Sequence, residues 1–244
     1  MNTPRAILGL AAASVALMAL SAGVAPAAVM NVRPVPVSGT ALQDYLTSVG
    51  QTINVNTDQK GNALWTTTVS GNSTFTIKLE LGAPLVSQSI GIYSDGAAAT
   101  RLPIFPSNSG PGWFTVTSFD VGTKGHVVSN LFDQNAMWQS SVSYTGVNSS
   151  AFGFYIDHPG TTGAACFGED DENAGLAPAN AMNVVYAATG TSVGSWWIAF
   201  QSTPKNTDGS GAFTDALVFL ESVNAPTPVR PSTWGGIKNL YSPR

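Results

Sequence analysis

Four consecutive acidic residues, Glu169-Asp170-Asp171-Glu172, are the densest group of charged side chains in the sequence. Neighbouring carboxylates repel one another, so they stay ionised only where water or a cation neutralises them. Two more carboxylates, Asp208 and Asp215, lie in and just after a loop that is rich in Asn, Ser and Gly. Carboxylate and carbonyl oxygens are the ligands that Ca²⁺ prefers. The sequence therefore predicts Glu169, Asp170, Asp208 and Asp215 as candidate ligands of calcium. The alternative is that the acidic run is a solvated loop.

The sequence contains little that a hydrolytic enzyme could use. Its two histidines, His126 and His158, stand in no nucleophile or zinc motif. A glycosidase needs two carboxylates across a cleft, and Glu80 and Glu221, at the ends of two predicted strands, are one such pair. We predict that the protein is not an enzyme, and a glycoside hydrolase is the remaining catalytic alternative.

Apolar runs of strand length, separated by turn residues, position these groups. Phe75, Ile77 and Leu79 alternate with polar residues, which is typical of a strand that buries one face. The runs Trp196–Gln201 and Ala216–Val223 are predicted to be buried strands, and the two adjacent tryptophans of the first run should point to opposite faces. Further strands are predicted at residues 64–69, 74–80, 89–93, 113–119, 140–144, 151–156 and 182–187.

The number and spacing of these runs predict the fold class. Residues 41–49 alone have the apolar spacing of a helix, and helices are missing between the strands. Residues 64–69 and 74–80 flank a turn-prone segment and are predicted to form a hairpin. We predict an all-β fold, an antiparallel β-sandwich of jelly-roll type with one short N-terminal helix. Its core should contain Phe75, Ile77, Phe154, Ile198, Phe200, Leu217 and Phe219.

The two ends of the chain differ from its middle. Residues 1–28 combine one basic residue, a mostly apolar run and a small-residue site, the three parts of a secretory signal peptide. After residue 224 the sequence becomes proline-rich and then aromatic and basic. We predict a signal peptide at 1–28, a β-sandwich domain at 29–224, and a Pro-rich linker with a C-terminal tail at 225–244.

The charge of the chain limits its possible partners, and its cysteine content limits how the fold can be stabilised. Ten Lys and Arg stand against fourteen Asp and Glu, a net charge of −4, and no basic stripe exists to bind phosphates, so nucleic acid is excluded as a partner. The single cysteine, Cys166, allows no internal disulfide, so an exported domain must depend on its core for stability. No membrane span is expected after signal cleavage.

The C-terminal half of the sequence resembles a known family. Residues 194–200 and 213–219, with the strand Phe152-Gly153-Phe154-Tyr155, resemble the end of the bacterial secreted proteins known as domain of unknown function 4114, over about residues 150–223. Asp215 matches that family's pattern, whereas Gln201-Ser202 replaces its Glu-Asp step. The resemblance implies a β-sandwich of exported and surface proteins that binds calcium.

These observations together predict an exported β-sandwich, secreted or at the cell surface, that acts as a surface structural or binding module. The alternatives to this role are a lectin-like carbohydrate-binding domain and a glycoside hydrolase. Its expected partners are cell-surface or extracellular components, glycans among them.

Overall fold

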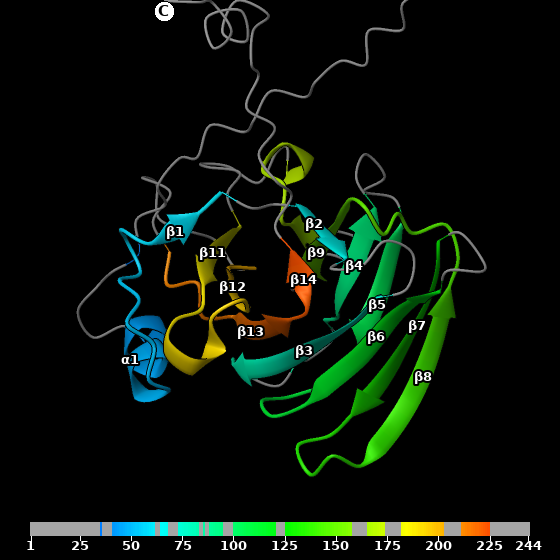
Figure 1. The fold of residues 1–244 in the computed structure, drawn as a ribbon, viewed down its shortest axis with the longest axis horizontal. Coiled ribbons are helices and arrows are strands. Elements are labelled where there is room, and N and C mark those ends of the chain that lie inside the picture. The colour runs from blue at the N-terminus through cyan, green and yellow to red at the C-terminus, as the bar shows by residue number, and fades with distance from the viewer. Residues whose placement is uncertain are drawn as a thin grey trace, which may run out of the picture. The chain divides into compact units, whose positions relative to one another are not determined.

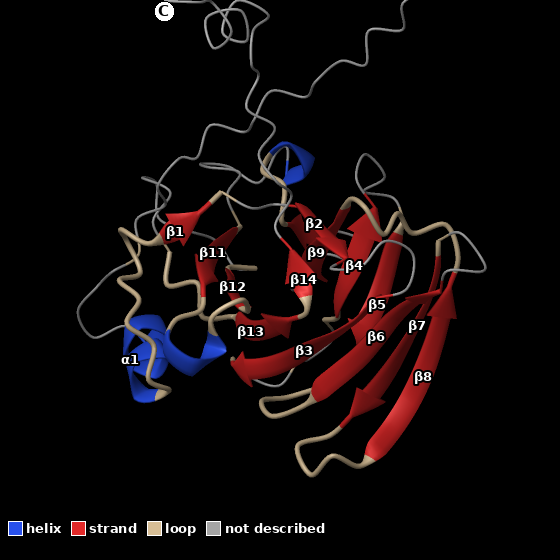
Figure 2. Cartoon of the chain, viewed as in Figure 1, coloured by secondary structure: helices blue, strands red, loops and turns tan. Residues whose placement is uncertain are grey.

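A computed structural model describes residues 35, 41–61, 64–67, 73–82, 85, 88–94, 100–120, 125–157, 165–173, 182–202 and 211–224 of the chain (Figure 1). The predicted signal peptide at 1–28 and the predicted linker and tail at 225–244 lie outside these residues. Strands dominate the described part, and helical segments are short (Figure 2). None of its helices is long and apolar enough to cross a membrane.

The described elements follow one another along the chain with a single α-helix ahead of the strands. They are α1 (Ala41–Ser48), β1 (Gln59–Lys60), β2 (Leu64–Thr67), β3 (Ser73–Leu81), β4 (Ile90–Ser94), β5 (Arg101–Phe105), β6 (Phe114–Asp120), β7 (His126–Phe132), β8 (Trp138–Tyr144), β9 (Phe152–Asp157), β10 (Ala165–Phe167), the 3-10 turn η1 (Asp171–Asn173), β11 (Asn183–Ala187), the 3-10 turn η2 (Gly190–Ser192), β12 (Trp196–Phe200), β13 (Ala216–Glu221) and β14 (Val223–Asn224).

These strands form two antiparallel sheets. The large sheet has the order β1-β11-β12-β13-β3-β6-β7-β8, and the small sheet has the order β14-β2-β9-β4-β5, with β10 added beside β9. The all-β antiparallel sandwich with one short helix is therefore confirmed. The jelly-roll connection is not confirmed, because β6 to β8 and β11 to β13 each remain as a three-stranded meander within the large sheet.

Aromatic rings from both sheets meet in the main core. Phe152 on β9 of the small sheet stacks against Phe75 on β3 of the large sheet, with ring centroids 5.5 Å apart, and lies 5.2 Å from Phe119 on β6. Trp65 on β2 meets Trp196 on β12 edge to face at 5.2 Å. Each offset or edge-to-face contact contributes about 0.5–1.5 kcal/mol of stability beyond that gained by burying the rings. These contacts join the two layers.

The predicted core residues are buried almost without exception. Phe75, Ile77 and the others of that set are at most 2% exposed, except Phe219, which is half-buried. Phe219 instead packs against Trp197, with ring centroids 4.6 Å apart, beneath the helical side of the large sheet. Its ring therefore belongs to a second, smaller core.

This second core lies between α1 and the outer face of the large sheet. Leu42 and Leu46, one helical turn apart, are fully buried against a cluster that includes Trp197. The neighbouring residue Trp196 packs on the opposite face, in the main core. The predicted division of the two tryptophans between faces is therefore confirmed, and each face is covered by packing.

The predicted hairpin between residues 64–69 and 74–80 is wrong. Strand β2 pairs with β9 and β14 in the small sheet, whereas β3 pairs with β6 and β13 in the large sheet. Trp65 and Phe75 both lie within about 6 Å of Phe154, at ring-centroid distances of 6.1 and 6.3 Å. Two consecutive strands thus bury their aromatic residues by entering one core from opposite layers, which local periodicity cannot distinguish from a hairpin.

Two glycine–tyrosine pairs cross between β4 and β9 on the face of the small sheet opposite the main core. Gly91 pairs with Tyr155, and Tyr93 pairs with Gly153. A Cβ atom built on Gly91 would lie 2.5 Å from Cε1 of Tyr155, and one built on Gly153 would overlap the ring of Tyr93. Each tyrosine ring therefore covers the backbone of the glycine opposite, which only glycine permits.

We expect Gly153→Ala to lower the free energy of unfolding by roughly 1–3 kcal/mol, because the new methyl group overlaps the Tyr93 ring. In a Tyr93→Ala background the same substitution should cost clearly less, since the ring is gone. Urea unfolding of the four proteins of this double-mutant cycle at neutral pH measures both costs. Equal costs in both backgrounds would show that the Tyr93 ring is not the reason why residue 153 is glycine.

Burial raises the pKa of the Tyr93 and Tyr155 hydroxyls, and nearby carboxylates, Glu169 for Tyr93 and Asp157 for Tyr155, raise them further. The unfolded chain loses tyrosine protons near pH 10, whereas the folded chain keeps them, so the stability contribution is intact below about pH 10 and is lost as the pH rises above it.

Above about pH 10, each of these tyrosines should lower the unfolding free energy by up to about 1.4 kcal/mol per pH unit. Tyr93→Phe should remove its share of that slope. Urea titrations between about pH 9 and about pH 11 test this, and an unchanged slope in the variant would contradict it.

Candidate functional site

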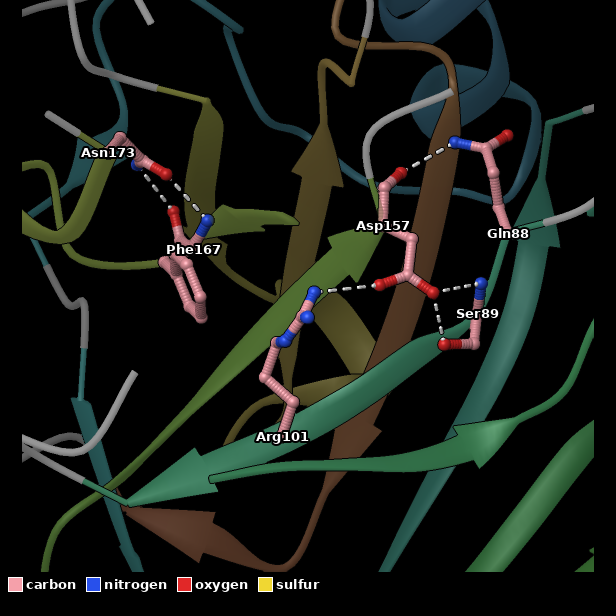
Figure 3. A network of polar contacts seen from close by, with 6 residues as sticks. All are labelled: Gln88, Ser89, Arg101, Asp157, Phe167 and Asn173. Atoms are coloured by element: carbon pink, nitrogen blue, oxygen red, sulfur yellow. Dashed lines mark hydrogen bonds and ion pairs between the residues drawn. The ribbon is translucent and has the colours of Figure 1, made fainter. Parts of the chain in front are cut away.

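The acidic run lies directly after β10 and is closed by a buried amide. The side chain of Asn173, 1% exposed, accepts a hydrogen bond from the Phe167 N–H at 2.7 Å and donates to the Phe167 carbonyl at 2.8 Å (Figure 3). It also donates to the Glu169 carbonyl at 2.9 Å. The turn that presents Glu169 and Asp170, both half-buried, is therefore fixed by Asn173.

Glu169 is also fixed from the small sheet. Its backbone N–H donates to the Tyr93 hydroxyl at 3.1 Å. The ring of Tyr93 in turn meets Phe167 edge to face at 5.0 Å. The acidic turn thus sits on the cluster of Tyr93, Tyr155, Ala165 and Phe167, which covers the outer side of the small sheet.

Asp215 has a different role, because donors surround its carboxylate. Its Oδ2 accepts hydrogen bonds from the Ser202 N–H at 2.7 Å, from Ser202 Oγ at 3.0 Å and from Gln201 Nε2 at 3.5 Å. The Gln201 Oε1 accepts from the Phe213 N–H at 2.8 Å. Asp215 therefore ties the end of β12 to the start of β13, and the two residues at the position of the resembled family's Glu-Asp step act as donors.

The structure describes three of the four predicted calcium ligands. Glu169 and Asp170 follow β10, Asp215 precedes β13, and Asp208 lies outside the described residues. Within the described ranges there is no group of three or more His, Cys, Asp or Glu that could hold a metal ion. Calcium binding by these residues stays a prediction.

A network of polar contacts links the two sheets, and the sequence did not indicate it. Asp157, at the end of β9, accepts from Ser89 N at 2.9 Å and Ser89 Oγ at 2.5 Å, and Arg101 Nη1 lies 3.3 Å from its Oδ1 (Figure 3). Gln88 Nε2 donates to the Asp157 carbonyl at 2.8 Å and to Ser202 Oγ at 3.2 Å. Through Ser202 this network reaches Asp215 and the large sheet.

The carboxylate pair suggested for glycoside hydrolysis is poorly spaced. Glu80 is held by Lys78 at 2.8 Å and by the Tyr45 hydroxyl at 2.8 Å. Glu221 pairs across strands with Thr76, four residues from Glu80. Four residues of strand span about 13 Å, more than the roughly 5–9.5 Å between the carboxyl groups of glycosidases. This register disfavours the pair as acid and base.

The outer side of β3, β6, β7 and β8 carries a row of aromatic side chains. Lys78, Phe114, Phe132 and Trp138 are successive cross-strand partners, and the register of β7 against β8 shifts between Leu131 and Phe132. The rings of Phe114 and Phe132 stack at 5.0 Å with planes 10° apart. The side chain of Trp138 is 61% exposed.

Two parallel rows of mostly hydroxyl and amide residues follow the aromatic one. Thr76, Val116, Asn130 and Ser141 form the first, and Thr74, Ser118, Val128 and Ser143 form the second. The hydroxyls of Thr74 and Ser118 bond to each other at 2.8 Å. We call the three rows together the aromatic face.

Charges at the margins of the aromatic face are held in pairs. Lys78 lies 2.8 Å from Glu80, and the carboxylate of Asp120 lies 3.5 Å from Nδ1 of His126. The other ring nitrogen of His126 is 2.7 Å from Ser143 Oγ. The aromatic face is therefore largely uncharged and rich in hydrogen-bonding groups.

Comparison with known proteins gives no significant match to any family model, curated protein or solved structure. The resemblance to domain of unknown function 4114 therefore stays a prediction, and the residues carry the functional argument.

We expect Ca²⁺ to raise the melting temperature if Glu169 and Asp170 bind it, by the equivalent of about 2.7 kcal/mol at a hundredfold excess over the dissociation constant. Glu169→Gln with Asp170→Asn should abolish this rise. Asp215→Asn, in contrast, should lower the melting temperature even with chelator present, because it weakens hydrogen bonds to a charged acceptor. Identical melting curves in calcium and in chelator would refute calcium binding.

Proposed function

We propose that the protein is an exported, non-catalytic binding module that holds neutral glycan chains on its aromatic face. The observation that carries this proposal is the row of Phe114, Phe132 and Trp138 on three adjacent strands, ending in a largely exposed indole. Exposed apolar rings surrounded by polar groups mark binding surfaces on soluble proteins. Large aromatic rings offer flat apolar area at small conformational cost.

The spacing of the row supports a polysaccharide as the ligand. Neighbouring strands lie about 4.8 Å apart, which is similar to the repeat along a chain of pyranose sugars. The exposed Trp138 ring can therefore stack against one sugar, while Phe114 and Phe132, whose rings stack on each other, add apolar contact for the next sugars along the chain. The next rows supply Thr76, Asn130, Ser141 and Ser143, whose hydroxyl and amide groups both donate and accept hydrogen bonds.

The charge of the face supports a neutral ligand. Lys78 is neutralised by Glu80, and His126 faces Asp120, so no cluster of cations is presented to an acidic chain. The largely uncharged aromatic face fits binding better than catalysis, since a hydrolase needs convergent carboxylates in a cleft. The location, outside the producing cell, rests on the predicted signal peptide at residues 1–28.

We expect Trp138→Ala to weaken the binding of neutral oligosaccharides by about tenfold or more, because a hot-spot aromatic side chain contributes more than 1 kcal/mol. Calorimetric titration with cello-, xylo- and manno-hexaose, after a glycan-array screen, measures this. Val193→Ala is the matched control, because Val193 is an exposed apolar residue, 76% accessible, between η2 and β12.

Two outcomes would overturn the proposal. One is that none of the neutral glycans binds the wild-type protein. The other is that Trp138→Ala binds as tightly as Val193→Ala. Titration with chelator present separates direct stacking from a lectin that binds sugar through calcium, since the aromatic face itself needs no metal.

A further inference from the structure

Strand β8 is a long and unprotected edge of the large sheet. Among the described residues it pairs with β7 alone, and it is the last strand of the sheet order (Figure 1). Its seven residues, Trp-Gln-Ser-Ser-Val-Ser-Tyr, include no charge and no proline, and none of them is buried. An edge strand presents a row of N–H and C=O groups that a further strand can bind.

The other edges of the two sheets carry protection that β8 lacks. The opposite edge of the large sheet, β1, is two residues long and includes Lys60. In the small sheet, β14 is also two residues long, and β5 contains Arg101 and Pro103. Short length, a cation and a proline are the usual means by which proteins prevent edge-to-edge pairing. Of these four edge strands β8 alone lacks all three, although its pairing with β7 shifts register between Leu131 and Phe132.

We propose that β8 is a dimerisation strand that pairs antiparallel with β8 of a second copy of this chain, about a twofold axis near Ser141. In such an isologous contact Ser141 meets its own counterpart, and residues equally far on either side of it, such as Gln139 and Ser143, meet each other. Like charges placed directly opposite across strands would repel. The uncharged run from Gln139 to Ser143 avoids that repulsion, which is the feature that favours a second copy over a charged partner strand.

Antiparallel pairing also covers apolar surface at the start of β8 in each copy. Met137 and Trp138, at the start of the strand, are 62% and 61% exposed, and Tyr144 at its end is half-buried. The pairing places the start of one copy's strand beside the end of the other's. It therefore covers part of Met137 and Trp138 in each copy and extends the large sheet continuously across the dimer. Tyr144 points to the small sheet instead, where its hydroxyl donates to the Pro103 carbonyl.

This inference rests on the backbone of β8, whereas the glycan proposal rests on side chains of the aromatic face, and the two share Trp138 and Ser141. Dimerisation is measured without glycan and glycan binding by titration, so each proposal can fail separately. Sedimentation velocity and light scattering of the purified protein over a wide concentration range should show a reversible monomer–dimer equilibrium. Ser141→Lys, which places two cations at the axis, should weaken the dimer by about tenfold or more. Val142→Pro should do the same by disrupting the edge.

Asn130→Lys is the matched control, because Asn130 is the β7 partner of Ser141 on the same face but not at the edge. It should dimerise like the wild-type protein, and thermal melts verify that all variants fold. A wild-type protein that is monomeric at every concentration overturns the inference. So does a dimer that persists unchanged in both Ser141→Lys and Val142→Pro, or one that Asn130→Lys weakens equally.

Discussion

The packing of Phe152 and Phe154 of β9 against the large sheet is the interaction on which the remaining structure depends. Both rings are nearly inaccessible, and they contact Phe75, Phe119 and Trp65, which come from three other strands. The chain has a single cysteine, Cys166, which is buried, so no internal disulfide holds its layers. Burial of large aromatic side chains, at about 1.5–3 kcal/mol each, must therefore supply the contact between sheets.

The same strand imposes a second constraint on its other face. Residues 152, 154 and 156 point into the main core, so residues 153 and 155 point outward. There Gly153 lies beneath the Tyr93 ring and Tyr155 covers Gly91. The rings lie flat against the sheet and support the acidic turn after β10. A carboxylate-rich turn is thus held by an apolar cluster, with Glu169 and Asp170 half-buried.

The two ends of the outer face of the large sheet differ in whether another element covers them. On its outer side, α1 covers β11 to β13, while the described residues leave β6 to β8 uncovered. The transverse row that begins with Trp197 and Phe219 under the helix continues through Lys78 to Phe114, Phe132 and Trp138. One structural row therefore serves as core at one end and as a candidate binding surface at the other. The difference is whether a covering element is present.

The sequence alone determined the all-β class, the single helix and most strand positions, because alternation of apolar residues depends on the local geometry of a strand. Six of the seven residues predicted for the core are buried, and the seventh, Phe219, is half-buried. It missed the short strands β1 and β10, and also β5, where Pro103 interrupts the pattern, and β7, whose apolar residues alternate with serine and asparagine.

Only the tertiary structure decided which strands pair. The assignment of β2 and β3 to different sheets, the rows of the aromatic face and the link from Asp157 through Gln88 to Asp215 all join residues far apart in sequence. Periodicity fixes which way a side chain points relative to its own strand, but it does not fix which strand lies beside it. The acidic run was conspicuous in sequence because its residues are adjacent, whereas the aromatic face exists only through cross-strand register.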